Sequence, residues 1–207
     1  MNLSKLLLQP CRIITESWDY RLYMKKSIKT VVIFCGAHAS PTYLELAGEV
    51  GKALAQHGFA AVTGGGPGMM SEVNKSARLH GGESYGICIR KPEESPQREN
   101  FTHFEIYDSF DERHKKLLSY GDAFLALPGG LGTIYEAIEI TQRKKFKEIP
   151  METPLIFVGK YFERLTKVFL ELANEGFITD VDSLYRFAPT VNDMIVTLKE
   201  HRDKPNQ

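Results

Sequence analysis

The stretch that decides the fold is Leu127-Pro128-Gly129-Gly130-Leu131-Gly132-Thr133-Ile134-Tyr135-Glu136. It follows an apolar run at residues 122–127 and leads into a segment with helical periodicity. Its three glycines have no Cβ to obstruct an anion, their N–H groups can point inward, and the positive end of the helix dipole lies at the same place. The stretch therefore predicts a phosphate-binding turn, with the carboxylate of Glu136 one helical turn above it.

A second glycine-rich stretch, Thr63-Gly64-Gly65-Gly66-Pro67-Gly68-Met69-Met70, follows a short apolar run and also leads into a helical segment. Neither stretch has the G-x-G-x-x-G spacing of dinucleotide-binding turns or the Gly-Lys-Ser/Thr ending of the Walker loop, so NAD binding and ATP hydrolysis are not indicated. Glycines also permit tight turns and close packing, so a purely structural role for the second stretch stays open. Two such turns in one chain favour a ligand site.

Short apolar runs alternate with longer amphipathic segments from residue 30 onward. They predict strands at 31–34, 60–62, 85–89, 123–127 and 155–158, and helices at 43–57, 68–80, 110–120, 133–143 and 161–175. This alternation indicates an α/β fold, a Rossmann-like doubly wound parallel sheet flanked by helices, which binds ligands outside the carboxyl ends of its strands. We expect a helical arm at residues 1–29 and a single domain at residues 30–207.

The composition narrows the function classes. A chain of 207 residues with 43% apolar residues can bury one sizeable core, and a net charge of zero argues against a nucleic-acid partner. Three widely spaced cysteines, Cys11, Cys35 and Cys88, indicate reduced thiols in a cytoplasmic protein and show no metal-binding spacing. The leucine-rich start is too short for a membrane span, so we expect neither a membrane nor a metal.

Together the two glycine stretches match P-G-G-x-G-T-x-x-E and an upstream G-G-G-x-x-G-(L/M/I)-M. This pair of motifs resembles the signature of the Lonely Guy family of cytokinin-nucleotide phosphoribohydrolases, often called lysine decarboxylases, and the resemblance extends over residues 12–193. It implies hydrolysis of the N-glycosidic bond of a purine nucleoside 5′-monophosphate, adenine or N6-substituted adenine, to free base and ribose 5-phosphate. It also implies no cofactor and a homodimer or higher homo-oligomer.

Glu136 has two interpretations. Thr133 and Glu136 fit a T-x-x-E capping box, in which both residues only cap the helix, and the local sequence does not decide between cap and catalyst. The resemblance implies that this carboxylate is functional. Residues 134, 137, 138 and 141 form the expected buried face of the helix, which leaves Glu136 free to face a ligand.

The charged segment at residues 109–116 begins another predicted helix, with Ser109 and Glu112 suited to a capping box. Charges of this kind ordinarily form a solvated face. The resemblance implies that Arg113 is catalytic, but it is followed by His114 where the family has Lys. A histidine can titrate near neutrality, although a lone exposed histidine is more often inert.

The turn after the first predicted strand, Phe34-Cys35-Gly36-Ala37-His38-Ala39-Ser40, corresponds to a family turn beside the nucleotide, where Gly36 lets the backbone approach the ligand. His38 departs from the commoner family versions. We interpret Cys35 as a small core residue rather than a nucleophile, since no base is evident beside it. We expect Asn74, on the helix after the triple glycine, to form hydrogen bonds at the protein surface.

These considerations predict a hydrolase with Arg113 and Glu136 as catalytic residues. The predicted substrate- and phosphate-binding residues are Gly36, Gly65, Gly66, Gly68, Gly129, Gly130, Leu131, Gly132 and Thr133. The alternative is a non-catalytic nucleotide-binding or molybdenum-cofactor carrier protein of the same fold. A decarboxylase would need a lysine that holds pyridoxal phosphate, and the sequence offers no identifiable candidate.

Overall fold

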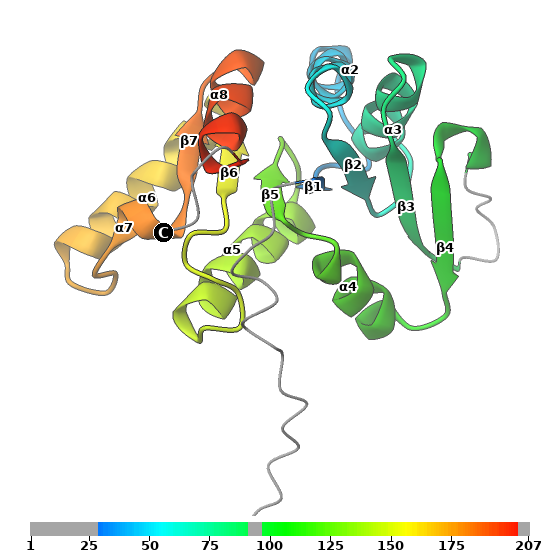
Figure 1. Ribbon diagram of the computed structural model, residues 1–207. Helices are drawn as coiled ribbons and strands as arrows, with labels where there is room; N and C mark the ends of the chain where they lie inside the picture. The colour runs from blue at the N-terminus through cyan, green and yellow to red at the C-terminus, as the bar shows by residue number, and fades with distance from the viewer. Residues whose placement is uncertain (1–28, 91–96, 203–207) are drawn as a thin grey trace, which may run out of the picture.

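The computed structural model describes residues 29–90 and 97–202, whose strands form one seven-stranded sheet in the order β4-β3-β2-β1-β5-β6-β7 (Figure 1). Every neighbouring pair is parallel. The strands are β1 (Thr30–Phe34), β2 (Ala60–Thr63), β3 (Ser84–Ile89), β4 (His103–Tyr107), β5 (Ala123–Ala126), β6 (Leu155–Val158) and β7 (Arg186–Ala188). The predicted arm at residues 1–29 lies, apart from its last residue, outside the described residues.

Helices cover both faces of the sheet, which gives three layers (Figure 1). The α-helices are α2 (Pro41–Gln56), α3 (Met69–Leu79), α4 (Phe110–Ser119), α5 (Leu131–Lys145), α6 (Glu163–Asn174), α7 (Val181–Leu184) and α8 (Val191–Arg202), and the 3-10 turns are η1 (Arg98–Asn100) and η2 (Lys160–Phe162). One apolar core lies under α2, α3 and α8, and the other lies under α4, α5 and η2. Within the described ranges, no helix is both long and apolar enough to span a bilayer.

This architecture confirms the predicted α/β, doubly wound parallel fold. The five predicted strands are present, but β4 and β7 were missed because both are edge strands with little full burial, so their sequences lack a continuous apolar run. The buried face of α5 also differs from the expected one. Ile140 is buried and Ile138 is exposed, because the helix turns Thr133, Ala137 and Ile140 toward the sheet.

The direction of strand addition reverses between β1 and β5, which lie side by side at the centre of the sheet. In doubly wound sheets the crevice at this reversal, beyond the carboxyl ends of the strands, is where ligands bind. Backbone hydrogen bonds join the two turns there: Leu127 N donates to Phe34 O at 2.9 Å, and Gly36 N donates to Pro128 O at 3.1 Å. The two turns therefore act as one structural unit.

The glycine turn after β2 is tied to the same unit. Met69 N donates to Gly36 O at 3.1 Å, and Gly68 has a φ of 68°, a left-handed conformation that favours glycine. A Cβ on Gly68 would overlap the Ala37 carbonyl oxygen. The structural role that the sequence left open for this turn is therefore real, at least at Gly68.

Asn74 is fully buried beneath this turn, so its expected surface role is wrong. Its amide nitrogen donates to Thr63 Oγ1 at 2.5 Å, and its amide oxygen accepts from Ser84 Oγ at 3.0 Å. Thr63 Oγ1 in turn accepts from Gly65 N at 3.0 Å. These buried hydrogen bonds fix the start of the glycine turn. Each of the buried side chains that make them has a hydrogen-bond partner.

The packing of α2 against α3 generates a stability prediction at two glycines of α2. A Cβ on Gly51 would overlap the Val73 carbonyl oxygen, whereas a Cβ on Gly48 would make only ordinary contact, 3.5 Å from Glu72 Oε1. We expect Gly51→Ala to lower the free energy of unfolding by about 1–3 kcal/mol through overpacking. The matched control Gly48→Ala should raise it by about 0.5–1 kcal/mol, since alanine favours the helix. Urea unfolding measures both, and equal effects at the two positions would contradict the close approach.

Candidate functional site

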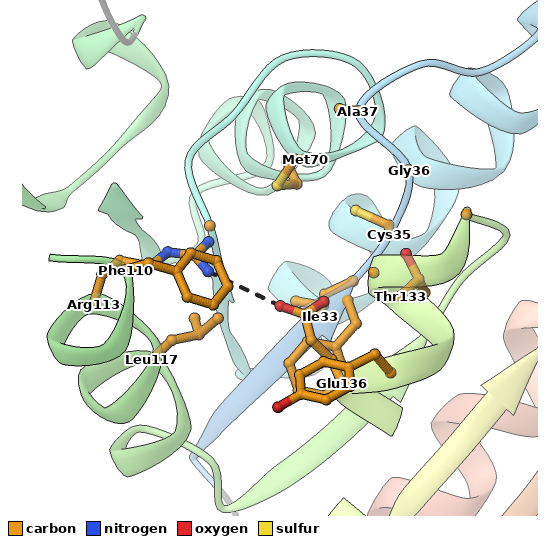
Figure 2. A pocket seen from close by; sticks show the side chains of 15 residues that line it. Ile33, Cys35, Gly36, Ala37, Met70, Phe110, Arg113, Leu117, Thr133 and Glu136 are labelled. Carbon is orange, nitrogen blue, oxygen red and sulfur yellow. Dashed lines mark ion pairs between the residues drawn. The ribbon is translucent and has the colours of Figure 1, made fainter. Parts of the chain in front are cut away.

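A pocket of about 350 Å³ opens at the carboxyl ends of β1, β2 and β5, between α4 and α5 (Figure 2). Such a volume suits a small organic ligand. Its wall combines both glycine turns, the turn after β1 and two charged side chains. The lining residues are Ile33, Phe34, Cys35, Gly36, Ala37, Gly64, Met70, Phe110, Arg113, Leu117, Gly130, Gly132, Thr133, Tyr135 and Glu136.

The structure brings most of the predicted site residues together. Both predicted catalytic residues line the pocket, as do four predicted binding residues: Gly36, Gly130, Gly132 and Thr133. The other five, Gly65, Gly66, Gly68, Gly129 and Leu131, lie outside this lining, although their turns border it. Gly64 lines the pocket instead of its neighbours, and the exposed His38 does not line it.

The capping-box interpretation of Thr133 and Glu136 is wrong. Helix α5 begins at Leu131 with Gly130 as its N-cap, so Thr133 lies inside the first turn, and no described side chain caps the helix. The first intrahelical bond runs from Ile134 N to Gly130 O at 3.2 Å. Gly130, Leu131 and Gly132 are exposed. The N–H groups of this first turn are therefore available to an anion.

Close contacts shape the turn before α5. A Cβ on Gly129 would overlap the Thr133 hydroxyl, so the turn can fold onto its own helix only with glycine there. The Tyr161 hydroxyl donates to Gly129 O at 2.7 Å and fixes that carbonyl from the β6 side. Sequence reasoning missed Tyr161, because no local signal links an aromatic residue after β6 to a turn more than thirty positions earlier.

Arg113 extends from α4 into the pocket. Its Nε donates to Ile87 O at 2.8 Å, and its Nη1 lies 3.9 Å from Glu136 Oε1 (Figure 2). A Cβ on Gly64 would overlap the guanidinium, so the glycine makes room for it. Burial lowers the pKa of Arg113, while the charge of Glu136 raises it, and the group remains a cation.

Glu136 faces Arg113 from the first turns of α5, with 18% of its side chain exposed. Burial raises the pKa of Glu136, and the positive charges of Arg113 and His114 act in the opposite direction. The carboxylate therefore depends on these two neighbours to remain ionised.

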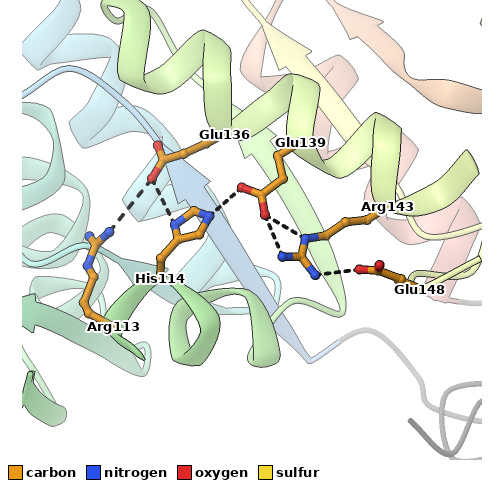
Figure 3. A network of polar contacts seen from close by, with 6 residues as sticks. All are labelled: Arg113, His114, Glu136, Glu139, Arg143 and Glu148. Carbon is orange, nitrogen blue, oxygen red and sulfur yellow. Dashed lines mark hydrogen bonds and ion pairs between the residues drawn. The ribbon is translucent and has the colours of Figure 1, made fainter. Parts of the chain in front are cut away.

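His114 belongs to a chain of polar contacts behind Glu136 (Figure 3). Its Nε2 lies 2.6 Å from Glu139 Oε2, and its Nδ1 lies 3.9 Å from Glu136 Oε1. His114 is buried, so its interpretation as an exposed histidine is wrong. The expected cap of the same helix is present, since Ser109 Oγ accepts from Glu112 N at 3.4 Å.

Two further residues complete this chain. Arg143 contacts Glu139 Oε1 through Nε and Nη2, both at 2.7 Å, and its Nη1 lies 2.8 Å from Glu148 Oε2. Burial acts to raise the pKa of Glu139, but hydrogen bonds from His114 and Arg143, with their charges, bring it below its usual value. Glu139 is therefore a fixed anion.

Cys35 also lines the pocket, but its chemistry is not that of a nucleophile. Burial, aided by the charge of Glu136, raises the pKa of its thiol far above the usual value. Cys88 is likewise a buried free thiol. Among residues 29–90 and 97–202, no group of three or more His, Cys, Asp or Glu side chains is arranged to hold a metal ion.

These features define a class of protein: a Rossmann-like α/β protein whose switch-point pocket joins an arginine–carboxylate pair to the uncapped start of a helix. Residues 70–198 match a protein family whose description is "Possible lysine decarboxylase". The chain belongs to this family, which its two glycine motifs identify as the Lonely Guy family.

Two relatives show how far the similarity extends. The chain is 31% identical to the cytokinin riboside 5′-monophosphate phosphoribohydrolase of Mycobacterium marinum, over 72% of this chain and 82% of that protein. It is 28% identical to a probable cytokinin riboside 5′-monophosphate phosphoribohydrolase of Oryza sativa subsp. japonica, over 84% of this chain and 77% of that one.

A solved structure supports the fold. The molybdenum cofactor carrier protein of Chlamydomonas reinhardtii superposes with a TM-score of 0.64 at 23% identity, over 85% of this chain and 99% of that chain. This likeness concerns the fold alone.

Proposed function

We propose that this protein hydrolyses the N-glycosidic bond of a purine nucleoside 5′-monophosphate, with adenine or an N6-substituted adenine as the base. The observation that carries the proposal is the position of Glu136, which lines the pocket one turn beyond the uncapped start of α5. The names of the relatives from M. marinum and O. sativa support the same reaction class.

The 5′-phosphate binds at the start of α5. Gly130, Leu131 and Gly132 are exposed there, the first N–H groups of a helix have no intrahelical partner, and Thr133 lines the pocket beside them. An anion at this place is favoured by the helix dipole and by the unpaired N–H groups. Binding energy from the remote phosphate then positions the sugar at Glu136.

Glu136 acts at the anomeric carbon. As the bond to the base breaks, positive charge develops on the sugar, and an ionised carboxylate stabilises that charge and orients the attacking water. Water adds its oxygen to C1′ and gives up a proton, while the base leaves with the bonding electron pair and takes up a proton. The products are the free base and ribose 5-phosphate.

Arg113 keeps this carboxylate ionised and in place, since its guanidinium lies 3.9 Å from Glu136 Oε1 and is itself held by the Ile87 carbonyl. Gly36, whose N–H donates to Pro128 O, lets the turn after β1 approach the ligand beside the turn before α5, as the resemblance implies. We infer no cofactor, because each step uses only main-chain and side-chain groups of this chain and water.

The second candidate is a nucleotide- or cofactor-binding protein without catalysis, which the fold likeness to the molybdenum cofactor carrier favours. The pairing of Arg113 with Glu136 in the pocket favours the enzyme. Thermal stabilisation by a nucleotide with no product formed would favour the carrier.

We further propose a cytoplasmic homodimer or higher homo-oligomer. Leu131, Tyr135 and Ile138 form an exposed apolar stripe along α5, with Leu131 86% exposed. Tyr135 lies both in this stripe and in the pocket wall, so a second copy bound there would border the site. The buried free thiols Cys35 and Cys88 support the cytoplasmic location, because free thiols are typical of reducing compartments.

The catalytic proposal predicts release of ribose 5-phosphate from AMP or N6-isopentenyl-AMP. Glu136→Gln keeps the shape but removes the charge, and we expect it to lower kcat by about 100-fold or more, the loss typical of a missing charge-stabilising group. Chromatography of the products measures both rates. The exposed His103 on β4 supplies a control, because His103→Gln should leave the rate unchanged. No turnover by the wild type, or equal turnover by Glu136→Gln, would remove the proposal.

The phosphate-binding proposal predicts discrimination between AMP and adenosine. Adenosine lacks the group that the start of α5 would bind, so we expect kcat/KM for adenosine to be lower by at least about 100-fold. Inorganic phosphate or ribose 5-phosphate should inhibit AMP hydrolysis competitively. Comparable kcat/KM values for the two substrates would contradict the phosphate site.

The assembly proposal predicts that a substitution in the apolar stripe of α5 changes the mass of the assembly in solution. Wild-type protein should sediment as a dimer or a larger oligomer, and Ile138→Glu should shift it toward monomer, because a buried unpaired charge opposes association. Leu79→Glu on α3, where Leu79 is 73% exposed against 37% for Ile138, should leave the mass unchanged. A monomeric wild type, or an unaltered mass for Ile138→Glu, would refute this interface.

A further inference from the structure

His114 lies behind Glu136 rather than in the pocket. It is not among the lining residues, and only 9% of its side chain is exposed. Its ring stacks on Phe110 with a centroid distance of 5.8 Å and an interplanar angle of 4°, and Tyr135 flanks it at 6.4 Å. The imidazole therefore lies outside the pocket lining and can act on a bound ligand only through its neighbours.

The ring is fixed from one side. Nε2 lies 2.6 Å from Glu139 Oε2, the length of a short charge-assisted hydrogen bond, so this nitrogen carries a hydrogen and donates it. Glu139 is held in turn by two contacts from Arg143, which is anchored by Glu148 (Figure 3). Few rotamers of His114 would preserve these contacts.

The other nitrogen points at Glu136. Nδ1 is buried and finds no hydrogen-bond partner among the described residues, and it lies 3.9 Å from Glu136 Oε1. This distance exceeds that of a hydrogen bond, which needs an approach of about 1 Å more. A small movement of the Glu136 side chain would therefore allow a hydrogen bond between His114 Nδ1 and Glu136 Oε1.

Charged groups surround the His114 ring. From α5 it faces Tyr135 and the carboxylates of Glu136 and Glu139, with Arg143 beyond, and Arg113 lies beside it on α4. The two carboxylates are three positions apart on one helix face, and the charge of Glu139 raises the pKa of Glu136. A cation between them offsets this repulsion, whereas a neutral ring does not.

We propose that His114 is a positioning residue whose imidazolium, clamped by Glu139, holds the Glu136 carboxylate in place and in its ionised form. The inference deepens the proposed hydrolase function and rests on it. The contacts that run from Arg143 through Glu139 to His114 thereby support Glu136. This support is separate from the one that Arg113 supplies.

Kinetics of three variants test this role. His114→Gln keeps a polar side chain but no charge, and we expect kcat to fall by up to about 100-fold, as for a misplaced reacting group, with KM little changed. The acid limb of its pH profile should move to higher pH, since Glu136 loses a positive neighbour. His114→Lys should restore most of kcat, because a lysine side chain supplies a positive charge at the same place. His103→Gln should match the wild type.

A spectroscopic measurement tests the contact without any turnover. Near neutral pH, proton NMR of the wild type should show two slowly exchanging imidazole N–H signals from His114, assigned by their loss in His114→Lys. Glu139→Gln should abolish or shift the Nε2–H signal, and Glu136→Gln should shift the Nδ1–H signal.

The kinetic and NMR measurements distinguish failure of the hydrolase proposal from failure of the positioning role. If the wild type hydrolyses no purine nucleotide but the two N–H signals respond as described, the hydrolase proposal fails and the His114–Glu136 contact stands. A single N–H signal that ignores Glu136→Gln would overturn the positioning role. The positioning role would also be overturned if His114→Gln left kcat and the pH profile unchanged. The same holds if His114→Lys were as impaired as His114→Gln and kept the wild-type pH profile.

Discussion

The pocket depends on glycine turns that lie closer to neighbouring atoms than a Cβ would allow. Gly68 meets the turn after β1, Gly129 folds onto Thr133, and Gly64 leaves room for the Arg113 guanidinium. At each position a Cβ would overlap an existing atom, so the glycines are fixed by packing as well as by any ligand. The same close approach leaves main-chain N–H groups exposed at the start of α5, where an anion can reach them.

Electrostatics adds a second constraint. A half-buried carboxylate tends to take up a proton, and burial raises the pKa of Glu136 accordingly. Arg113 approaches it from one side and His114 from another, so that α4 supplies the positive charges and α5 the negative ones. Glu136 and its two basic neighbours therefore belong to two helices that the sheet holds beside each other.

The fold could be predicted wherever a local pattern reports burial on both faces. Strands β1, β2, β3, β5 and β6 have continuous apolar runs, and the alternation with helices indicates a parallel sheet. The edge strands β4 and β7 have no such run and were missed. Asn74 was misplaced for a related reason: a polar residue on a helix looks exposed until its partners, Thr63 and Ser84, are known.

The sequence by itself determined the alternating strands and helices, the two glycine turns and the nomination of Arg113 and Glu136, because these are signals within short windows. Only the tertiary structure decided that Thr133 and Glu136 form no capping box, that Gly64 rather than its neighbours lines the pocket, and that Tyr161 holds the turn before α5. It also decided that His114 is buried between two carboxylates of another helix. The physical reason is that burial, ion pairing and close backbone contact depend on residues far apart in the chain, which meet only when the sheet brings α4 against α5.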